Sequence, residues 1–306
     1  MQRLVRLGLH GSMLSAIVQM YWEVPVVPKC GHAFSPAFPS TSGVKQADPL
    51  SPLLFGLFID VFESWLQTRL PEVGFPVSRS LVVQMLLYAD DMVLTASTAS
   101  ALQQQLDLLS EFCRITGMEV NLSKTEIVVF RKRPSRGSQE PPLGSWTFQG
   151  HPLQVSSQFR YLGVILHEFE GMRAAMEPLA TASRKAMWAM IARLNACGVQ
   201  DIRLKTRLLQ SLVLPITTYC SEVWAPSLLQ QWGKLEDILA NPLQQVHTSF
   251  LRLLGNLRAS TSTVILLREF GATPVAKHWL QSSSVAVLAQ GWQDEGGLPI
   301  ISHHAS

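Results

Sequence analysis

The chain has 306 residues, of which 47% are hydrophobic and 15% charged, and its formal net charge is +3. The charged fraction is below the roughly 25% usual in soluble domains, which favours a chain that packs against other protein. No uncharged apolar run reaches the roughly 18 residues of a membrane span, so we expect no membrane partner. The four cysteines form no CxxC pair, which argues against a disulfide framework or zinc site and favours an intracellular, reducing compartment.

The first strong helix signal follows a turn with two prolines. Residues 43–55 have the sequence GVKQADPLSPLLF, and an apolar helix is expected over residues 53–66. Ser51 is expected to cap this helix, with Pro52 in the first turn, where its missing N–H leaves no bond unmade. Taken alone, the segment predicts only a well-capped core helix.

Residues 82–96, VVQMLLYADDMVLTA, are typical of a β-hairpin. Aspartate is a common turn former, so Asp90 and Asp91 have an ordinary structural interpretation between the two apolar runs. Apolar strands, however, predict a hairpin that lies against a core, where neighbouring like charges repel and lose hydration unless a cation compensates them. Mg²⁺ ions, which take oxygen ligands and assist phosphoryl transfer, would supply that charge.

A helix and a strand are expected after the hairpin. Ser100 and Gln103 fit a capping box, and Gly117 suits the left-handed residue that ends a helix. One helical face would carry Leu102, Leu106, Leu109 and Cys113. A strand is expected over residues 126–130. Residues 131–145 are rich in Pro, Gly, Ser and charge, begin with the basic run RKRPSR, and predict an exposed loop.

The remainder of the chain is expected to be mostly helical. A strand-like segment at 159–166, FRYLGVIL, precedes helices expected over residues 176–194, 202–219 and 234–253. The cations of the first two helices, by themselves typical of a solvated helix face, are Arg184, Lys185, Arg193, Arg203, Lys205 and Arg207. Trp65, Trp188 and Trp224 are interpreted as packing residues.

Six segments, in order, resemble the motifs of reverse transcriptases. Tyr88-Ala89-Asp90-Asp91 resembles the YADD box, and residues 43–55 resemble the GxxQGxPLSPxLF segment that precedes it. Residues 117–126, GMEVNLSKTE, and residues 159–164, FRYLGV, resemble the motifs that follow the box. The segments LPITTYCSEVW at 214–224 and LRLLG at 251–255 are similar to thumb segments of non-LTR (LINE-type) retrotransposon polymerases.

The resemblance implies an α+β fold. A partial right-hand polymerase palm over residues 1–166 would carry the catalytic hairpin, and an α-helical thumb with a C-terminal tail would follow over residues 167–306. The implied activity is that of an RNA-directed DNA polymerase, by two-metal nucleotidyl transfer with Mg²⁺ or Mn²⁺. The implied partners are an RNA template, a DNA primer and deoxynucleoside triphosphates.

The resemblance also assigns roles to residues. Asp90 and Asp91 would hold the metal, and Lys124 would lie near the departing pyrophosphate. The residues implied to face the template base or incoming nucleotide are Gln46, Tyr88 and Ala89. Those implied to contact nucleic-acid phosphates are Arg203, Lys205 and Arg207.

Two departures from the family pattern stand out. The first catalytic aspartate of the family lies upstream of the Gln-containing loop, and no such pattern precedes Gly43, so we expect an N-terminally truncated chain that is inactive by itself. Ala47 stands where the motif usually has Gly, and a methyl group where close backbone approach or a positive φ is needed would cost on the order of 1 kcal/mol. The alternatives are an inactive nucleic-acid-binding remnant or pseudogene product, and a maturase-like protein of group II introns. The segment YCSEVW argues against the maturase.

Overall fold

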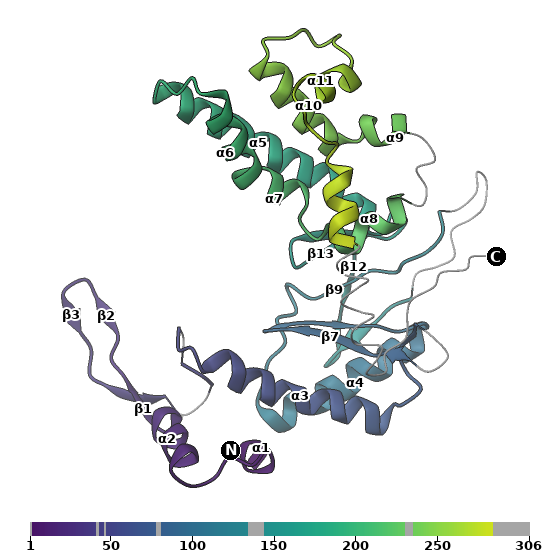
Figure 1. Cartoon of the computed structure of the whole chain (residues 1–306). Coiled ribbons are helices and arrows are strands. Elements are labelled where there is room, and N and C mark those ends of the chain that lie inside the picture. The colour runs from purple at the N-terminus through teal and green to yellow at the C-terminus, as the bar shows by residue number, and fades with distance from the viewer. Residues whose placement is uncertain are drawn as a thin grey trace. The chain divides into compact units, whose positions relative to one another are not determined.

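The computed structural model describes residues 2–40, 43–45, 47–77, 81–133, 144–229 and 235–283 (Figure 1). The chain forms two compact units. Unit 1 comprises Met1–Asn121 and Gly144–Pro152, and unit 2 comprises Leu122–Leu143 and Leu153–Ser306. The expected division between palm and thumb at residue 166 stays a prediction. Among the described helices, none has the length and apolar character needed to span a membrane.

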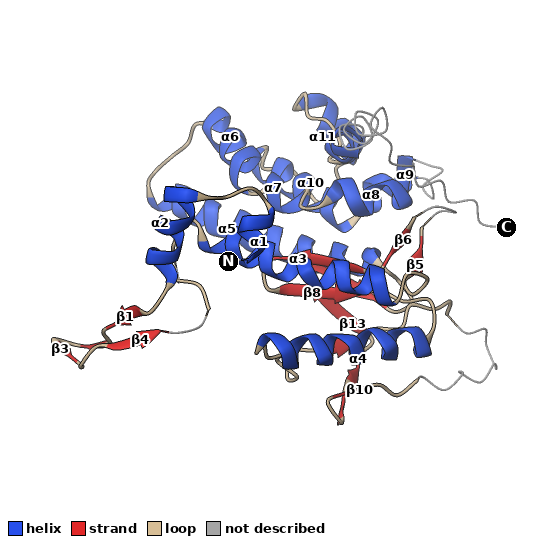
Figure 2. Cartoon of the chain, turned by 90° about the horizontal axis from the view of Figure 1, so that it is seen from below, coloured by secondary structure: helices blue, strands red, loops and turns tan. Residues whose placement is uncertain are grey.

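Unit 1 combines helices with two-stranded antiparallel sheets. Its elements are α1 (Gln2–Arg6), α2 (Gly11–Tyr21), β1 (Val24–Val26), β2 (Lys29–Cys30), β3 (Ala33–Phe34), β4 (Phe38–Ser40), α3 (Ser51–Arg69), β5 (Phe75–Pro76), β6 (Val82–Val83), β7 (Met85–Tyr88), β8 (Asp91–Leu94), α4 (Ala99–Thr116), β10 (Thr147–Phe148) and β11 (His151–Pro152). The pairs are β1 with β4, β2 with β3, β5 with β6, β7 with β8 and β10 with β11. Figure 2 shows how short these strands (red) are beside α3 and α4 (blue), so the helices supply most of the packed core.

The core of unit 1 is built where α3 meets α4. Phe62 and Leu66 of α3 are fully buried, and the Phe62 ring lies 5.1 Å from that of Phe112 on α4. Trp65 meets the same ring edge-on at 5.6 Å and also contacts the guanidinium of Arg69. Aromatic pairs at these distances add to the free energy of burial. The two helices therefore form the support for the hairpin of β7 and β8 (Figure 1).

The predicted ends of α3 and α4 are confirmed in part. Gly117 ends α4 with φ +74°, as predicted. The N-cap, however, is Thr98, whose hydroxyl accepts the N–H of Ala101 at 3.1 Å, so the capping box at Ser100 was wrong. Ser51 does not cap α3, because its hydroxyl donates instead to the carbonyl of Lys45 at 2.6 Å.

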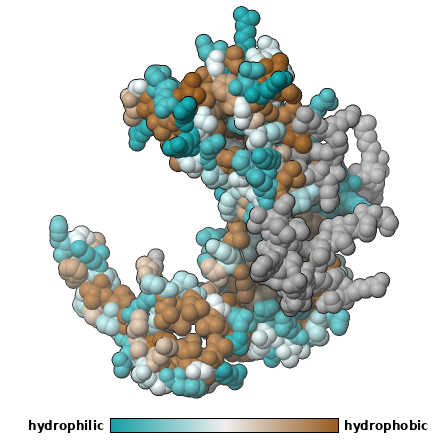
Figure 3. Space-filling view, in the orientation of Figure 1, coloured by the Kyte–Doolittle hydropathy of each residue, from teal (hydrophilic) through white to brown (hydrophobic). Residues whose placement is uncertain are grey.

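Exposed hydrophobic side chains gather on one visible face of unit 1. Figure 3 shows them in brown over the N-terminal helix and α3. The exposed hydrophobic residues of the N-terminal segment and α3 include Val5, Leu7, Leu53 and Phe58. Contiguous apolar surface of this kind is typical of a face that packs against other protein, in keeping with the low charged fraction.

Unit 2 is mainly helical. Its elements are β9 (Glu126–Ile127), β12 (Gln154–Val155), β13 (Gln158–Tyr161), β14 (Val164–His167), η1 (Met172–Ala175), α5 (Met176–Ala196), α6 (Ile202–Leu212), α7 (Leu214–Thr217), α8 (Ser221–Leu229), α9 (Leu235–Ala240), α10 (Pro242–Leu254) and α11 (Thr263–Glu269). β9 pairs in parallel with β12, and β13 pairs antiparallel with β14. The strand expected over residues 126–130 is therefore shorter than predicted.

Two of the expected helices are broken where a proline follows. The helix expected over residues 202–219 ends at Leu212, and Pro215 in α7 has no N–H to continue the bonding pattern. The helix expected over 234–253 is interrupted at Asn241, whose side chain accepts the N–H of Leu243 at 2.8 Å and so caps α10. Proline in a first helical turn is well tolerated, and both breaks start a new helix.

One hydrophobic cluster holds the helices of unit 2 together. Trp224 and Trp279 are almost fully buried, with ring centroids 5.3 Å apart in an edge-on arrangement. Each indole N–H donates to a backbone carbonyl, as buried tryptophan requires. The interpretation of Trp224 as a packing residue is confirmed. Trp188 is 55% exposed, so the same interpretation was wrong there, because it lies on the outer side of α5.

The buried imidazole of His247 on α10 predicts that stability depends on pH. Burial, and to a smaller degree the neighbouring His278, lower the pKa of His247 from 6.5 to about 4. The unfolded chain therefore binds more protons between these two pH values. The contribution of neutral His247 to the free energy of unfolding is therefore fully present above about pH 6.5 and is lost as the pH falls toward 4.

We expect His247→Gln to reduce this loss. The measurement is the free energy of unfolding in denaturant at intervals between pH 7 and pH 4, with the exposed His10→Gln as control. Equal pH dependence in both variants would show that His247 is not the responsible group.

Candidate functional site

The hairpin of β7 and β8 carries the two adjacent aspartates. Its register pairs Met85 with Leu94 and Tyr88 with Asp91, which leaves Ala89 and Asp90 as a two-residue loop. The prediction that Asp90 and Asp91 lie at the tip of a β-hairpin is confirmed.

The tight loop requires an unusual backbone conformation. Ala89 has φ +53°, in the left-handed region that favours glycine and asparagine. Two-residue hairpin loops demand a positive φ because only then does the loop match the twist of the strands. Holding alanine there costs on the order of 1 kcal/mol. The loop thus keeps Asp90 at the end of the hairpin despite local strain.

The two faces of β7 differ in burial. Leu86 and Tyr88 are 45% and 61% exposed, whereas Met85 and Leu87, which alternate with them, are half-buried. Asp90 and Asp91 are both exposed. The expectation that the carboxylates lose hydration against a core was therefore wrong, because the tip projects beyond the packed part of the strands.

The exposed carboxylates can serve as metal ligands, but they form a pair and not a complete set. Oxygen donors of this type suit Mg²⁺. Among the described residues, no group of three or more His, Cys, Asp or Glu side chains is placed to hold a metal ion. Two other aspartates of unit 1 have partners: Asp60 forms an ion pair with Arg3, and Asp48 accepts the N–H of Leu50 at 2.8 Å. Two carboxylates leave further ligand positions open on a Mg²⁺ ion.

Two buried glutamines lie at the base of the hairpin, and the sequence analysis did not identify either of them. Gln84 immediately precedes β7, and Gln105 belongs to α4. Both side chains donate hydrogen bonds to backbone carbonyls. The sequence signal for Gln105 was a polar residue on an otherwise apolar helix face, within the run LQQQL.

The loop before α3 is partly described. Gln46, predicted to face the nucleotide, lies outside the described residues. Ala47 is exposed and has φ +61°, so of the two reasons for glycine at this position, close backbone approach and a positive φ, the structure shows the positive φ.

Lys124 belongs to unit 2. It lines an open pocket of about 420 Å³ together with Ser123, Glu126, Gln158, Phe159, Arg160 and Ile165. Two segments that resemble separate family motifs, residues 117–126 and 159–164, thus meet in one pocket. Two cations face one anion there, which makes the pocket suitable for a phosphate group.

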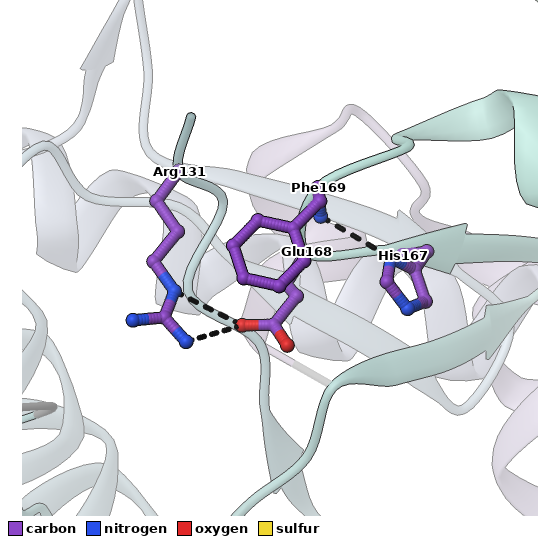
Figure 4. Close-up of polar contacts among 4 residues, drawn as sticks. All are labelled: Arg131, His167, Glu168 and Phe169. Atoms are coloured by element: carbon purple, nitrogen blue, oxygen red, sulfur yellow. Dashed lines mark hydrogen bonds and ion pairs between the residues drawn. The ribbon is translucent and has the colours of Figure 1, made fainter. Parts of the chain in front are cut away.

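The basic run that begins at residue 131 is largely neutralised where the structure describes it (Figure 4). Arg131 donates from Nε and Nη2 to one carboxylate oxygen of Glu168, at 3.0 and 2.9 Å, and its guanidinium lies 4.9 Å from the centroid of Phe169. Arg133 pairs with Glu170 at 3.2 Å. The largely buried pair of Arg131 and Glu168 therefore stabilises the fold of unit 2, and Arg133 also has a counter-charge beside it.

The cations of α6 lie on two sides of the helix. Arg203 and Arg207 are exposed and one turn apart, so they share a face. Lys205 is half-buried and lies about 200° around the helix from each of them. The expectation of one cationic face fits Arg203 and Arg207 but does not fit Lys205.

Tyr219 joins two more of the recognised segments within unit 2. Its hydroxyl donates to the carbonyl of Leu162 at 2.7 Å. In the same turn Gly163 has φ +85°, and a Cβ there would lie 3.3 Å from the Tyr219 ring. Glycine therefore allows both the turn and the close approach of the ring.

The chain is similar to known reverse transcriptases over about half of its length. The family model described as reverse transcriptase (RNA-dependent DNA polymerase) matches residues 11–166. Relatives include the Retrovirus-related Pol polyprotein from type-2 retrotransposable element R2DM of Drosophila melanogaster, 33% identical over 135 residues, which cover 42% of this chain and 12% of the relative. The corresponding polyprotein from type-1 element R2 of Nasonia vitripennis is 30% identical over 132 residues, again 42% and 12%. That of Popillia japonica is 27% identical over 160 residues, 51% and 25%. The chain spans a quarter or less of the length of these relatives.

The positive φ of Ala47 predicts that Ala47→Gly stabilises unit 1 by roughly 0.5–1 kcal/mol, because the methyl group is strained and, being exposed, packs little. The measurement is the free energy of unfolding in denaturant. Ala16→Gly is the matched control, at an exposed position within α2, and should destabilise by about 1 kcal/mol. A loss of stability in both variants would contradict the prediction.

Proposed function

The chain belongs to the reverse transcriptase (RNA-dependent DNA polymerase) family, of the non-LTR retrotransposon type, and we propose from this premise that it is the catalytic-hairpin part of an RNA-directed DNA polymerase. In this proposal residues 1–166 are the polymerase palm and residues 167–306 a helical thumb with a C-terminal tail. The family itself implies a palm-type fold, and the mixed helices and small sheets are consistent with it.

The observation that carries the proposal is the exposed Asp90-Asp91 pair at the hairpin tip. Both side chains are accessible, and the turn prevents the strands from covering them. The family uses divalent metal ions, and we propose that Asp90 and Asp91 supply oxygen ligands to Mg²⁺, or to Mn²⁺ in its place. When bound, such ions activate a 3′-hydroxyl and stabilise a leaving pyrophosphate.

The proposed substrates are an RNA template, a DNA primer and deoxynucleoside triphosphates. Tyr88 and Ala89, next to the aspartates, would face the template base and incoming nucleotide, in keeping with the exposure of both residues. Gln46 keeps the same proposed role. Lys124 would contact a phosphate of the leaving group, which its place beside Arg160 in the pocket of unit 2 supports.

On the thumb we propose Arg203 and Arg207 as contacts to the phosphates of the primer–template duplex. Both are exposed on one face of α6. Lys205 is not part of this face, because a single duplex that lies along Arg203 and Arg207 does not reach the opposite side of the helix. Phosphate contacts of this kind position a duplex without reading its sequence.

A second candidate function is nucleic-acid binding without catalysis. The absence of a third carboxylate beside Asp90 and Asp91 among the described residues favours it for this chain taken alone. The two candidate functions predict different results in a primer-extension assay and the same result in a binding assay, so both assays are needed.

We expect the 306-residue chain to extend no DNA primer on an RNA template with Mg²⁺ or Mn²⁺. Two-metal transfer needs carboxylates on opposite sides of the ions, and the hairpin tip offers them from one side. A version extended by the upstream segment that carries the first aspartate of the family should extend the primer. Asp90→Asn should abolish that activity, and Asp107→Asn, at an exposed carboxylate of α4, should leave it intact.

Primer extension by the 306-residue chain, lost in Asp90→Asn, would contradict the expected inactivity. No extension by the longer version would favour the binding function.

The thumb proposal predicts salt-dependent binding of an RNA–DNA hybrid. Neutralising Arg203 and Arg207 together by glutamine should reduce the slope of log affinity against log salt by roughly 1 for each phosphate that is no longer neutralised. The measurement is a titration by fluorescence anisotropy at several salt concentrations. Lys205→Gln on the opposite side of α6 is the matched control, and an equal effect of both changes would refute a single binding face.

A further inference from the structure

Two glutamine side chains are buried in unit 1 beneath the hairpin. Gln105 of α4 is fully buried, and Gln84 is 7% exposed. A buried amide costs free energy unless its polar atoms form hydrogen bonds. The position of these bonds therefore shows what the two side chains hold in place.

Gln105 ties α4 to both strands of the hairpin. Its Nε2 donates to the carbonyl of Thr95 at 3.1 Å and to that of Gln84 at 3.3 Å. These two residues lie just outside the last strand pair, Met85 with Leu94, and the N–H of Thr95 donates to the carbonyl of Gln84 at 2.9 Å. One amide group thus closes the base of the hairpin.

Gln84 ties the same base to the end of α3. Its Nε2 donates to the carbonyl of Val73 at 2.8 Å and to the carbonyl of Leu70, the residue that ends α3. The hairpin is therefore fixed to α3 through Gln84 and to α4 through Gln105. On β7 the side chains of Leu86 and Tyr88 are exposed and add little support.

The chemistry of the acceptors fixes the orientation of both amides. All four acceptors are backbone carbonyls, which cannot donate, so the NH₂ group of each glutamine has to face them. Neither Oε1 atom has a hydrogen-bond partner among the described residues. A methionine of similar size would fill the same space, so the donor group is what distinguishes glutamine here.

We propose that Gln105 and Gln84 are positioning residues that set the orientation of the hairpin, and with it the location of the Asp90 and Asp91 carboxylates. This inference rests on the proposed metal-binding function of that pair. With a rise of about 3.3 Å per residue, four residues separate base from tip by about 13 Å, so a tilt of about 5° moves the tip by about 1 Å. Metal ligands tolerate deviations of only about 0.2 Å.

The test compares Gln105→Met, which removes the donors and keeps the volume, with Gln104→Met at the neighbouring exposed position of α4. The first readout is amide hydrogen exchange of residues 85–94. We expect about tenfold faster exchange in Gln105→Met, the effect of losing hydrogen bonds at the base, and no change in Gln104→Met. Amides of α10 in unit 2 serve as an internal reference.

The second readout is Mn²⁺ affinity, followed by electron paramagnetic resonance of the free ion, with Asp90→Asn as background. Gln105→Met should weaken Mn²⁺ binding by about tenfold, although both carboxylates are intact, as residues that orient ligands do. Gln104→Met should bind as the unchanged chain does.

Each result decides one of the two proposals. Equal hairpin exchange in both variants, or faster exchange spread through all of α4, would overturn the positioning role. If the unchanged chain binds no more Mn²⁺ than Asp90→Asn does, the metal-binding function fails, and hydrogen exchange still decides whether the glutamines orient the hairpin. Should Gln105→Met not fold, Gln84→Met tests the same base through its bonds to the end of α3.

Discussion

Two adjacent carboxylates can lie side by side only where water or a cation compensates their repulsion, and the hairpin of unit 1 is built around this constraint. Its base is packed and its tip is hydrated. The two-residue loop, strained at Ala89, carries Asp90 beyond the packed part of the strands. Because one face of β7 is exposed as well, the hairpin depends on its base for a fixed orientation. The aromatic contact between α3 and α4 and the two buried glutamines supply that base.

In unit 2, recognised segments far apart in the sequence are joined by side-chain contacts. The Tyr219 hydroxyl reaches the turn at Leu162, and Gly163 leaves room for the ring. Ion pairs between residues far apart in the sequence also determine which cations of unit 2 have a counter-charge beside them. Arg131 is paired with Glu168, so it contributes to stability, whereas Arg203 and Arg207 remain exposed on α6. The location of a cation, more than the number of cations, therefore determines which surface can meet a phosphate backbone.

Much of the local structure was determined by the sequence alone. The apolar runs around Ala89-Asp90-Asp91 predicted the hairpin, and spacing at 3.6 residues predicted the buried face of α4. Gly117 marked the end of α4. These features depend on neighbours within a few residues, so periodicity and turn chemistry are sufficient to predict them. Gln46, by contrast, lies outside the described residues, and its role stays a prediction.

Only the tertiary structure decided which of these features are buried, paired or accessible. The hydration of Asp90 and Asp91, the partner of Arg131 and the exposure of Trp188 could not be read from local patterns. Gln105 looked like one polar residue among three, and its role at the hairpin base appears only once residues 84 and 95 are beside it. The physical reason is that burial and hydrogen bonding depend on residues distant in sequence, which only the fold brings together.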